Sequence, residues 1–404
     1  MRTANIGLLT VLVGTMAASS LALFGLSVLA ADIIEEFDIT RSEIGILLAV
    51  NTAAGAALAP WLGRVTDRMG ARRSIIALLL VSAVGLAMVA VAQSYPALLV
   101  GSVVAGAPQG WGNPATNKLI VERLPEGRRG TVLGIKQSGV QVSVFLSGAT
   151  LPLAANGFGW RWAMGGYSFV AIALTVLAAT VLDEAKSRPS PGSKAASRSS
   201  TPLGPMVITV AIYAAAMGMA GGMINRFIPL FAHEELGYST AVAGLVAALT
   251  GLLAIGTRIW ISRFAEIRGA TVAPLVAMGL GASLTALMLA TATTVGGWIL
   301  WPAAIAGAFS VSAWNGVAML RVVNGVEPDS AGRASGVVIF GFLAGLAAGA
   351  PVAGWSVDRW NTYGVAWGAA LMLGLVATAA IVSPTSRGSR PVSARADEAV
   401  RRTA

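Results

Sequence analysis

Five cationic side chains lie inside long apolar stretches of the sequence, where a charge is unexpected: Lys118, Lys136, Arg226, Arg258 and Arg321. A buried ammonium or guanidinium costs free energy unless polar groups, water or an opposite charge surround it. The carboxylates of the same stretches fall near their ends. An excess of positive charge in a cavity attracts anions and repels cations. The pattern therefore favours binding of a small anion.

Amide side chains accompany these cations at helical spacing. Gln137 follows Lys136 directly, and Gln141 lies one helical turn beyond Gln137. Four-residue spacing also places two asparagines of another stretch on one helix face, while two further asparagines stand alone. We expect the substrate to be bound by residues from this polar set: Lys136, Gln137, Gln141, Arg226, Asn113, Asn117, Asn225, Asn51 and Asn315.

The sequence offers few residues for enzymatic or metal chemistry. It has no cysteine and a single histidine, His233, so neither a thiolate nor a histidine cluster is available, and we expect no metal, no cofactor and no enzymatic activity. The net charge of +10 suggests nucleic acid, but the basic residues lie in short loops between apolar stretches. For proton coupling, the nearest carboxylates are Asp32 and Glu122.

The elements that position these residues are membrane helices. Of the 404 residues, 55% are hydrophobic and 11% are charged, and the mean hydropathy is +0.74. A soluble domain of this size could not bury so much apolar surface. Stretches of about 20 apolar residues predict spanning helices, and we place twelve: 6–30, 42–62, 74–93, 96–121, 130–155, 161–182, 206–231, 239–262, 271–293, 297–323, 332–356 and 362–383.

The first of these spans could be mistaken for a secretory signal. Its apolar stretch is longer than a usual signal core and eleven further spans follow, so we expect a membrane helix. On alternate assignment of the loops, 20 of the 28 Lys and Arg residues fall on one side and three on the other. The positive-inside rule then predicts a multi-pass protein of the cell (inner) membrane with both termini cytoplasmic.

The chain divides into two similar halves. We predict an N-terminal six-helix bundle over 1–183, a cytoplasmic linker rich in Ser and Pro over 184–205, a C-terminal six-helix bundle over 206–383 and a cytoplasmic tail over 384–404. A shift of 203 residues pairs Trp111 with Trp314 and Lys118 with Arg321. Such a parallel repeat is typical of secondary transporters that rock two halves about a central site.

One helix of the second half carries three glycines on a single stripe, Gly341, Gly345 and Gly349. Small residues at this spacing let membrane helices approach closely. We expect this stripe to pack against a neighbouring helix.

The loop between the second and third spans reads Gly63-Arg64-Val65-Thr66-Asp67-Arg68-Met69-Gly70-Ala71-Arg72-Arg73. This segment resembles the cytoplasmic signature of the major facilitator superfamily, and a degenerate second copy lies at 262–269. The resemblance implies an all-α fold of twelve transmembrane helices in two six-helix bundles. It also implies an inner gate, for which the candidates are Gly63, Asp67, Arg68, Gly70, Arg72, Arg73, Arg263, Glu266, Lys118 and Arg321.

The glycines and the aspartate of this predicted gate have physical reasons to occur there. Glycine tolerates positive φ, so Gly63 and Gly70 are expected to allow tight turns. We expect Asp67 to lie near a helix N-terminus, where the dipole would contribute about 0.3–1 kcal/mol.

The fifth span departs from the family's drug antiporters. It carries Gly134-Ile135-Lys136-Gln137-Ser138-Gly139 in place of their Gly-Pro pair, and this element resembles members that handle small anions. The sequence thus predicts a secondary transporter of a small organic or inorganic anion, proton-coupled and monomeric in the lipid bilayer. Two alternatives remain open, an efflux pump for drugs or other hydrophobic compounds and a non-transporting sensor on the same fold.

Overall fold

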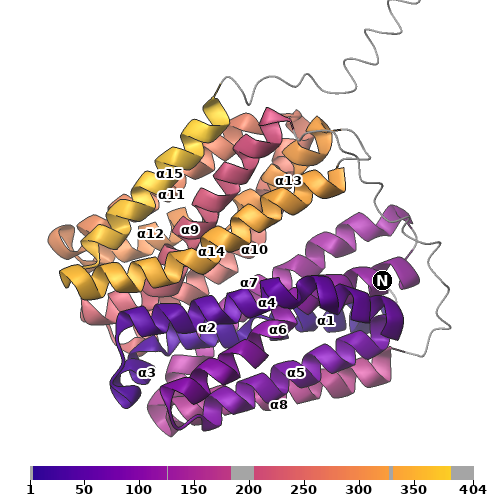
Figure 1. The fold of residues 1–404 in the computed structure, drawn as a ribbon, viewed down its shortest axis with the longest axis horizontal. Coiled ribbons are helices and arrows are strands. Elements are labelled where there is room, and N and C mark those ends of the chain that lie inside the picture. Colours follow the sequence, from indigo (N-terminus) through magenta and orange to yellow (C-terminus); the bar gives the residue numbers. More distant parts are fainter. Residues whose placement is uncertain (1–2, 125, 183–203, 327–330, 384–404) are drawn as a thin grey trace, which may run out of the picture. The chain divides into compact units, whose positions relative to one another are not determined.

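The structure is a computed structural model that describes residues 3–124, 126–182, 204–326 and 331–383. Every regular element in these ranges is helical (Figure 1). Most of the predicted linker and the whole predicted tail lie outside the described residues.

The helices before the linker follow one another with short connections. They are α1 (Thr3–Ala18), α2 (Leu21–Val28), α3 (Ala30–Phe37), α4 (Arg41–Met69), α5 (Ala71–Val91), α6 (Tyr95–Arg123), α7 (Glu126–Phe158) and α8 (Trp160–Val181). After the linker come α9 (Pro205–Glu234), α10 (Thr240–Arg268), α11 (Val272–Val295), η1 (Gly297–Ile299), α12 (Leu300–Phe309), α13 (Trp314–Gly325), α14 (Ala331–Trp360) and α15 (Gly364–Val382).

Two of the twelve predicted spans are not continuous helices. The predicted span 6–30 bends by 48° between α1 and α2, at Ser19 and Ser20. The predicted span 297–323 is divided into η1, α12 and α13, with a break at 310–313. The backbone N–H and the hydroxyl of Ser310 both donate to the carbonyl of Ala306. The N–H of Ser312 then donates to the carbonyl of Gly307 and that of Ala313 to the carbonyl of Ser310, so the regular helical bonding pattern is lost at this point.

Ten segments of the described residues are long and apolar enough to cross a membrane, the divided segment Gly297–Val322 among them, and the bent α1–α2 pair makes an eleventh. The twelfth predicted span is α6, whose 29 residues suffice in length. Its second half is less apolar than the other spanning segments, because it carries Gln109, Asn113, Asn117 and Lys118. The polar side chains in the second half of α6 therefore need an explanation other than contact with lipid.

The chain forms two compact units. Unit 1 comprises Met1–Arg188, Asn225–Ile255 and Ala350–Tyr363, and unit 2 comprises Pro189–Ile224, Gly256–Gly349 and Gly364–Ala404. Unit 1 therefore contains α1 to α8 together with the end of α9, the first half of α10 and the end of α14.

Within unit 1, small residues bring α4 and α6 close together. A Cβ added at Gly110 would lie 2.0 Å from the carbonyl oxygen of Gly55, and one added at Gly106 would lie 2.0 Å from that of Asn51. The indole of Trp111 also donates to the Thr66 hydroxyl at 2.8 Å. These interactions fix α6 against α4 along most of its length.

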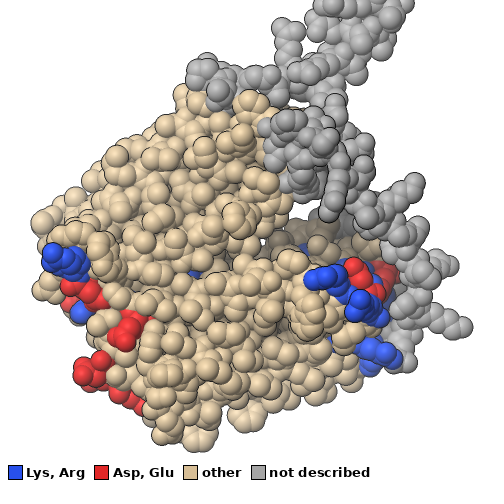
Figure 2. Space-filling model, viewed as in Figure 1, with Lys and Arg blue, Asp and Glu red and all other residues tan. Residues whose placement is uncertain are grey.

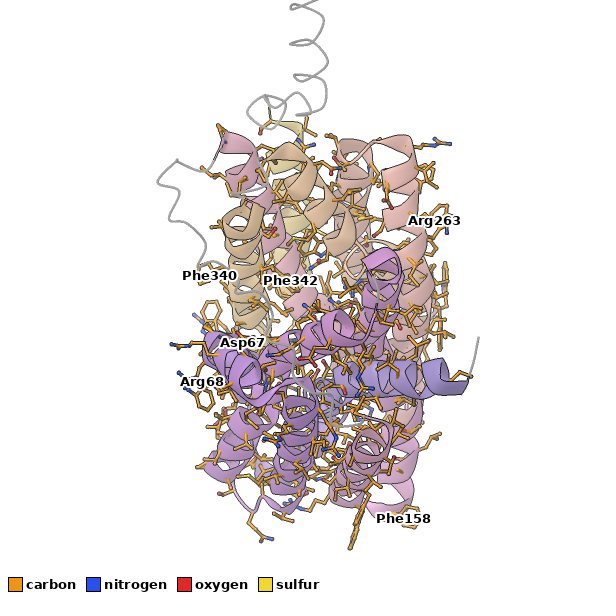
Figure 3. All side chains as sticks on the ribbon, turned by 90° about the vertical axis from the view of Figure 1, so that its right-hand side faces the viewer. Asp67, Arg68, Phe158, Arg263, Phe340 and Phe342 are labelled. Carbon is orange, nitrogen blue, oxygen red and sulfur yellow. The ribbon has the colours of Figure 1, made fainter. Side chains whose placement is uncertain are left out.

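Within unit 2, the predicted glycine stripe of α14 packs against α9. A Cβ at Gly341, Gly345 or Gly349 would lie 2.8, 2.1 or 2.3 Å from a backbone oxygen of α9. The prediction of close helix packing is confirmed. On the same helix, Phe342 packs against Trp314, whereas Phe340 is exposed on another face (Figure 3).

The outer surface of the helices is apolar. Trp61, Phe169 and Phe340 are among the many large apolar side chains that are exposed there, and Phe158 projects away from the end of α7 (Figure 3). On the face shown in Figure 2, charged side chains gather at the two ends of the unit 1 helices, and few lie in the band between them. This distribution suits a lipid environment.

Candidate substrate site and gates

Lys136 lies on α7 and reaches toward α6. Its ammonium donates hydrogen bonds to Asn113 Oδ1 at 3.1 Å, Thr116 Oγ1 at 2.7 Å and Asn117 Oδ1 at 2.5 Å. The side chain is buried, with 1% relative exposure. An ammonium has three N–H donors, so all three are satisfied by these partners.

The partners of Lys136 are neutral. Within the part of the chain that the structure describes, no carboxylate forms an ion pair with Lys136. Its hydrogen bonds are therefore satisfied while its charge is not compensated, an arrangement that is costly in an apolar interior.

The two asparagines that bind Lys136 are exposed, although they lie well inside α6. Their spacing of four residues places them on one face of the helix. Polar side chains in a spanning helix face a water-filled space or the bundle interior rather than lipid. Of the predicted substrate residues, the structure therefore brings Lys136, Asn113 and Asn117 together, with Thr116 added. Thr116 was missed, although it lies on the same helix face three residues from Asn113.

The other amides of the predicted set form no hydrogen bond with Lys136 in the described residues. Asn51 Nδ2 donates to the carbonyl of Ser102 at 2.9 Å, and Gln109 Nε2 donates to Asn51 Oδ1, so Asn51 serves the α4–α6 contact. Gln141 is buried on α7, and Gln137 beside Lys136 is half-buried. Asn315 is half-buried near the start of α13 in unit 2.

Arg226 forms a second buried cationic site in unit 1. Its guanidinium donates to the carbonyl of Leu48 at 3.3 Å and to Thr52 Oγ1 at 2.8 Å, and its own carbonyl accepts from Ser27 Oγ at 2.6 Å. Its relative exposure is 3%, and the preceding Asn225 is half-buried. Arg226 therefore fastens α9 to α2 and α4.

Arg226 and Lys136 occupy different levels of the α4–α6 pair. Arg226 binds α4 at Leu48 and Thr52, whereas Lys136 binds α6 at Asn113, Thr116 and Asn117. Gly106 faces Asn51 and Gly110 faces Gly55, so Asn113 lies level with position 58, six residues or about 9 Å beyond Thr52. The two cations share no hydrogen-bond partner within the described residues.

A charged cluster joins three helix ends at the predicted outer end of unit 1. Arg41 Nε lies 3.1 Å from Glu234 Oε2, which also accepts a hydrogen bond from the Tyr363 hydroxyl at 2.6 Å. The Asp358 carboxylate accepts from the backbone N–H groups of Arg41 at 3.2 Å and Ser42 at 2.7 Å. An anion at these N–H groups is favourable because they begin helix α4.

We name the outer cluster by these four side chains, Arg41, Glu234, Asp358 and Tyr363. It connects the start of α4 with the ends of α9 and α14. Sequence reasoning missed this cluster, because its hydrogen bonds join residues up to 317 positions apart. Each member taken alone is an ordinary polar residue near the end of a helix.

At the opposite end of α4 lies the signature segment. Asp67 is in the last turn of α4, so the expectation that a helix N-terminus stabilises it is wrong. Its side chain is 81% exposed, and it lies with Arg68 at the helix end (Figure 3). Lys118 Nζ binds the carbonyl oxygens of Thr66 at 3.2 Å and Asp67 at 2.9 Å, and lies 3.6 Å from Asp67 Oδ1. A cation at a helix C-terminus is favourable.

The two signature glycines differ in conformation. Gly70 has φ +82° and ends α4, as expected for a tight turn. Gly63 lies within α4 and has no positive φ, so the prediction of a tight turn at Gly63 is wrong.

The signature arginines also differ in what they contact. The guanidinium of Arg72 donates to the carbonyls of Ala179 at 3.0 Å and of Leu182, at the end of α8. Arg68 and Arg73 are exposed.

The second copy of the signature lies in unit 2, where a cation also binds the connection that follows the helix. Arg321 Nη1 donates to Thr271 Oγ1 at 3.3 Å, in the connection after α10. Lys118, its repeat partner, binds the end of α4, so both cations fasten the corresponding helix connection. Arg263 and Glu266 are exposed on α10 (Figure 3 labels Arg263).

The two predicted proton-coupling carboxylates have different surroundings. Asp32 lies in the first turn of α3, and its Oδ2 is buried with no hydrogen-bond partner among the described residues. Burial raises the pKa of Asp32, while a backbone hydrogen bond and the nearby His233 oppose that shift. Glu122 is exposed near the end of α6.

Solved transporter structures share this fold. A bacterial homologue of the human lysosomal transporter Spinster, in an inward-facing and occupied conformation, superposes with a TM-score of 0.74 at 16% identity, over 95% of each chain. The nucleoside transporter NupG gives a TM-score of 0.74 at 15% identity, over 93% of this chain and 97% of its own.

Sequence comparison identifies the family. The hexuronate transporter of Bacillus subtilis (strain 168) is 27% identical over 158 residues, which are 39% of this chain and 36% of that transporter. The sequence model of the Major Facilitator Superfamily matches residues 11–341. The predicted all-α fold and the expectation of a transporter rather than an enzyme are thus confirmed, and the chain belongs to the major facilitator superfamily.

Proposed function

We propose that this transporter carries a small anion by alternating access. The observation that carries the proposal is the ammonium of Lys136, which is buried at 1% exposure among neutral partners, next to exposed asparagines in a spanning helix. A charge placed centrally in a membrane helix costs about 2.5–3.5 kcal/mol on insertion scales. An anion that enters this site would offset that cost, whereas a cation would add to it.

The curated relative supports an organic anion. Its name describes transport of hexuronates, which carry a carboxylate, although the match spans about a third of its length. A carboxylate with several hydroxyl groups suits a site made of one cation and several amides, since amides both donate and accept hydrogen bonds.

The gates follow from the two ends of α4. The outer cluster would close one side through Arg41, Glu234, Asp358 and Tyr363, and Arg226 would reinforce it deeper in the membrane. The signature residues Asp67, Arg68, Arg72 and Arg73 and their counterparts Arg263 and Glu266 would control the other side. Lys118 and Arg321 would hold the connections that carry them.

Protons are the proposed coupling ion, and Asp32 is the proposed carrier. Its buried Oδ2 has no partner among the described residues, and its pKa is raised by burial, so protonation there is less costly than at an exposed carboxylate. Glu122 is the weaker candidate because it is exposed. We further propose a monomer in the cytoplasmic membrane, with both termini inside.

Uptake into proteoliposomes tests the proposal. The panel contains glucuronate as a carboxylate, nitrate as an inorganic anion and tetraphenylphosphonium as a lipophilic cation, each with and without a pH gradient. We expect saturable uptake of at least one anion and none of the cation. Transport of the cation alone would support the efflux alternative, and binding without flux of any compound would support a sensor.

A further inference from the structure

We infer that the anion is recognised by the side-chain amides of Asn113 and Asn117, and that Lys136 acts behind them as a positioning residue. This inference rests on the proposed function and adds the atoms that meet the substrate. It differs from the simpler view in which the ammonium itself binds the anion.

The ammonium of Lys136 has its hydrogen bonds fully used. Its three donors are all taken by oxygens of α6, at 3.1, 2.7 and 2.5 Å. An ammonium has no further donor. To bind an anion directly, Lys136 would have to release one of these bonds and become more exposed than the 1% seen here.

The lysine also fixes the orientation of the two amides. An ammonium only donates, so the group that faces it on each asparagine must be the oxygen and not the nitrogen. The planar amide then directs its Nδ2 away from Lys136. No hydrogen bond from either Nδ2 is formed within the described residues.

The amides are accessible where the lysine is not. Asn113 and Asn117 are exposed while Lys136 and Thr116 are buried, so the amides form the surface of the site and the lysine its support. The two asparagines are one turn apart on α6, and together they present four N–H donors on one helix face.

The charge of the lysine acts through these amides. A positive charge at the oxygen of an amide polarises its N–H groups, and hydrogen bonds in a chain of this kind strengthen one another. The face of α6 therefore offers donors with a positive potential behind them. Such a surface suits a carboxylate or an oxyanion and disfavours a cation.

The test removes the two amides and compares the result with removal of an asparagine elsewhere. Asn113→Ala and Asn117→Ala, singly and together, remove the amides that face the substrate. Asn156→Ala is the matched control, because Asn156 is an exposed asparagine near the end of α7, 20 residues from Lys136. Uptake of glucuronate and nitrate is measured for each variant, with KM and Vmax determined separately.

Amide recognition predicts that KM for the transported anion rises about tenfold for each asparagine removed, the usual effect of losing a hydrogen bond to a charged group. Asn156→Ala should change KM by no more than about twofold. Direct binding by Lys136 predicts the reverse, because loss of the asparagines frees two donors, so KM stays constant or falls. That result would overturn the inference.

Lys136→Gln and Lys136→Met test the positioning role. Glutamine keeps a donor that can face the two asparagine oxygens but lacks the charge, so its KM should fall between those of the wild-type protein and the methionine variant. A merely structural lysine would lower Vmax or folded yield with KM unchanged, which would contradict the positioning role. Melting temperatures in detergent identify variants that fail to fold. If the double asparagine variant fails to fold, the two single asparagine variants are used in its place.

The failures of the two proposals are distinguishable. If the wild-type protein carries no anion of the panel, the proposed function is wrong, and the inference is wrong with it. If the wild-type protein carries an anion and the double asparagine variant keeps its KM, only amide recognition is wrong.

Discussion

The ammonium of Lys118 lies 2.9 Å from the carbonyl oxygen of Asp67 and 3.6 Å from its carboxylate oxygen Oδ1. One side chain of α6 thereby caps the C-terminus of α4 and holds the signature aspartate. Its repeat partner Arg321 binds Thr271 in the corresponding connection of the second half. The cap links the signature segment to the helix that carries the asparagines of the proposed site.

Replacement of Lys118 by methionine should lower the free energy of unfolding by about 0.3–1 kcal/mol, the usual contribution of a cation at a helix C-terminus. Thermal unfolding in detergent measures the change. Arg263→Met is the matched control, because Arg263 is an exposed cation on α10. Equal stability of the wild-type and Lys118→Met proteins would contradict the capping role.

Disruption of the outer cluster should open one side of unit 1. Glu234→Gln weakens the ion pair with Arg41, and Tyr363→Phe removes the 2.6 Å hydrogen bond to Glu234. The chain has no cysteine, so a single Leu47→Cys substitution at a fully buried position of α4 provides a clean reporter. Labelling of that cysteine by a membrane-impermeant maleimide from the outside should rise severalfold in either variant. Trp355→Phe, at an exposed position near the end of α14, should leave labelling unchanged.

Asp32 should make stability depend on pH. Burial raises its pKa in the folded state, so the folded protein keeps this proton to a higher pH than the unfolded chain does. The free energy of unfolding should therefore fall as the pH rises from the ordinary carboxyl pKa of 3.8 to the raised value, and this contribution should stay constant above it.

Asp32→Asn should remove that contribution, so its melting temperature at neutral pH should equal or exceed that of the wild-type protein. If Asp32 also carries the coupled proton, uptake by the variant should no longer respond to a pH gradient. An unchanged gradient response would remove Asp32 from the coupling mechanism. Asp38→Asn, at an exposed residue just after α3, is the control.

Two glycines of α14 should respond to alanine with opposite signs. A Cβ at Gly345 would lie 2.1 Å from the carbonyl of Ala215, whereas one at Gly336 would have no neighbour within 4 Å. Gly345→Ala should destabilise the protein by about 1–3 kcal/mol through overpacking. Gly336→Ala should stabilise it by up to about 1 kcal/mol through helix propensity. Thermal unfolding of both variants tests whether the α9–α14 contact is as close as the structure has it.

Most of the fold could be predicted from apolar stretch length and charge asymmetry, because lipid requires helices of a set length. The breaks at Ser19–Ser20 and at 310–313 could not, since they depend on local backbone bonding within stretches that remain apolar. Asp67 was placed at the wrong helix end because a signature in a loop does not say where the helix before it stops.

The site was predictable in part. An unexpected charge in an apolar stretch pointed to Lys136, and helical spacing paired Asn113 with Asn117. What sequence could not supply was that these three meet each other, while Arg226 and Asn51 bind α4 and α6 residues at another level. Contacts between distant segments, such as Arg41 with Glu234, have no local signal at all.

The decisive comparison is uptake of labelled glucuronate and nitrate by the wild-type protein and by Lys136→Met, reconstituted side by side. Saturable anion uptake by the wild-type protein and a KM for the same anion raised at least tenfold in the methionine variant, with tetraphenylphosphonium excluded by both, is the predicted result. An equal KM for the anion in the two proteins, or uptake of the cation by the wild-type protein, would contradict a substrate site built on Lys136.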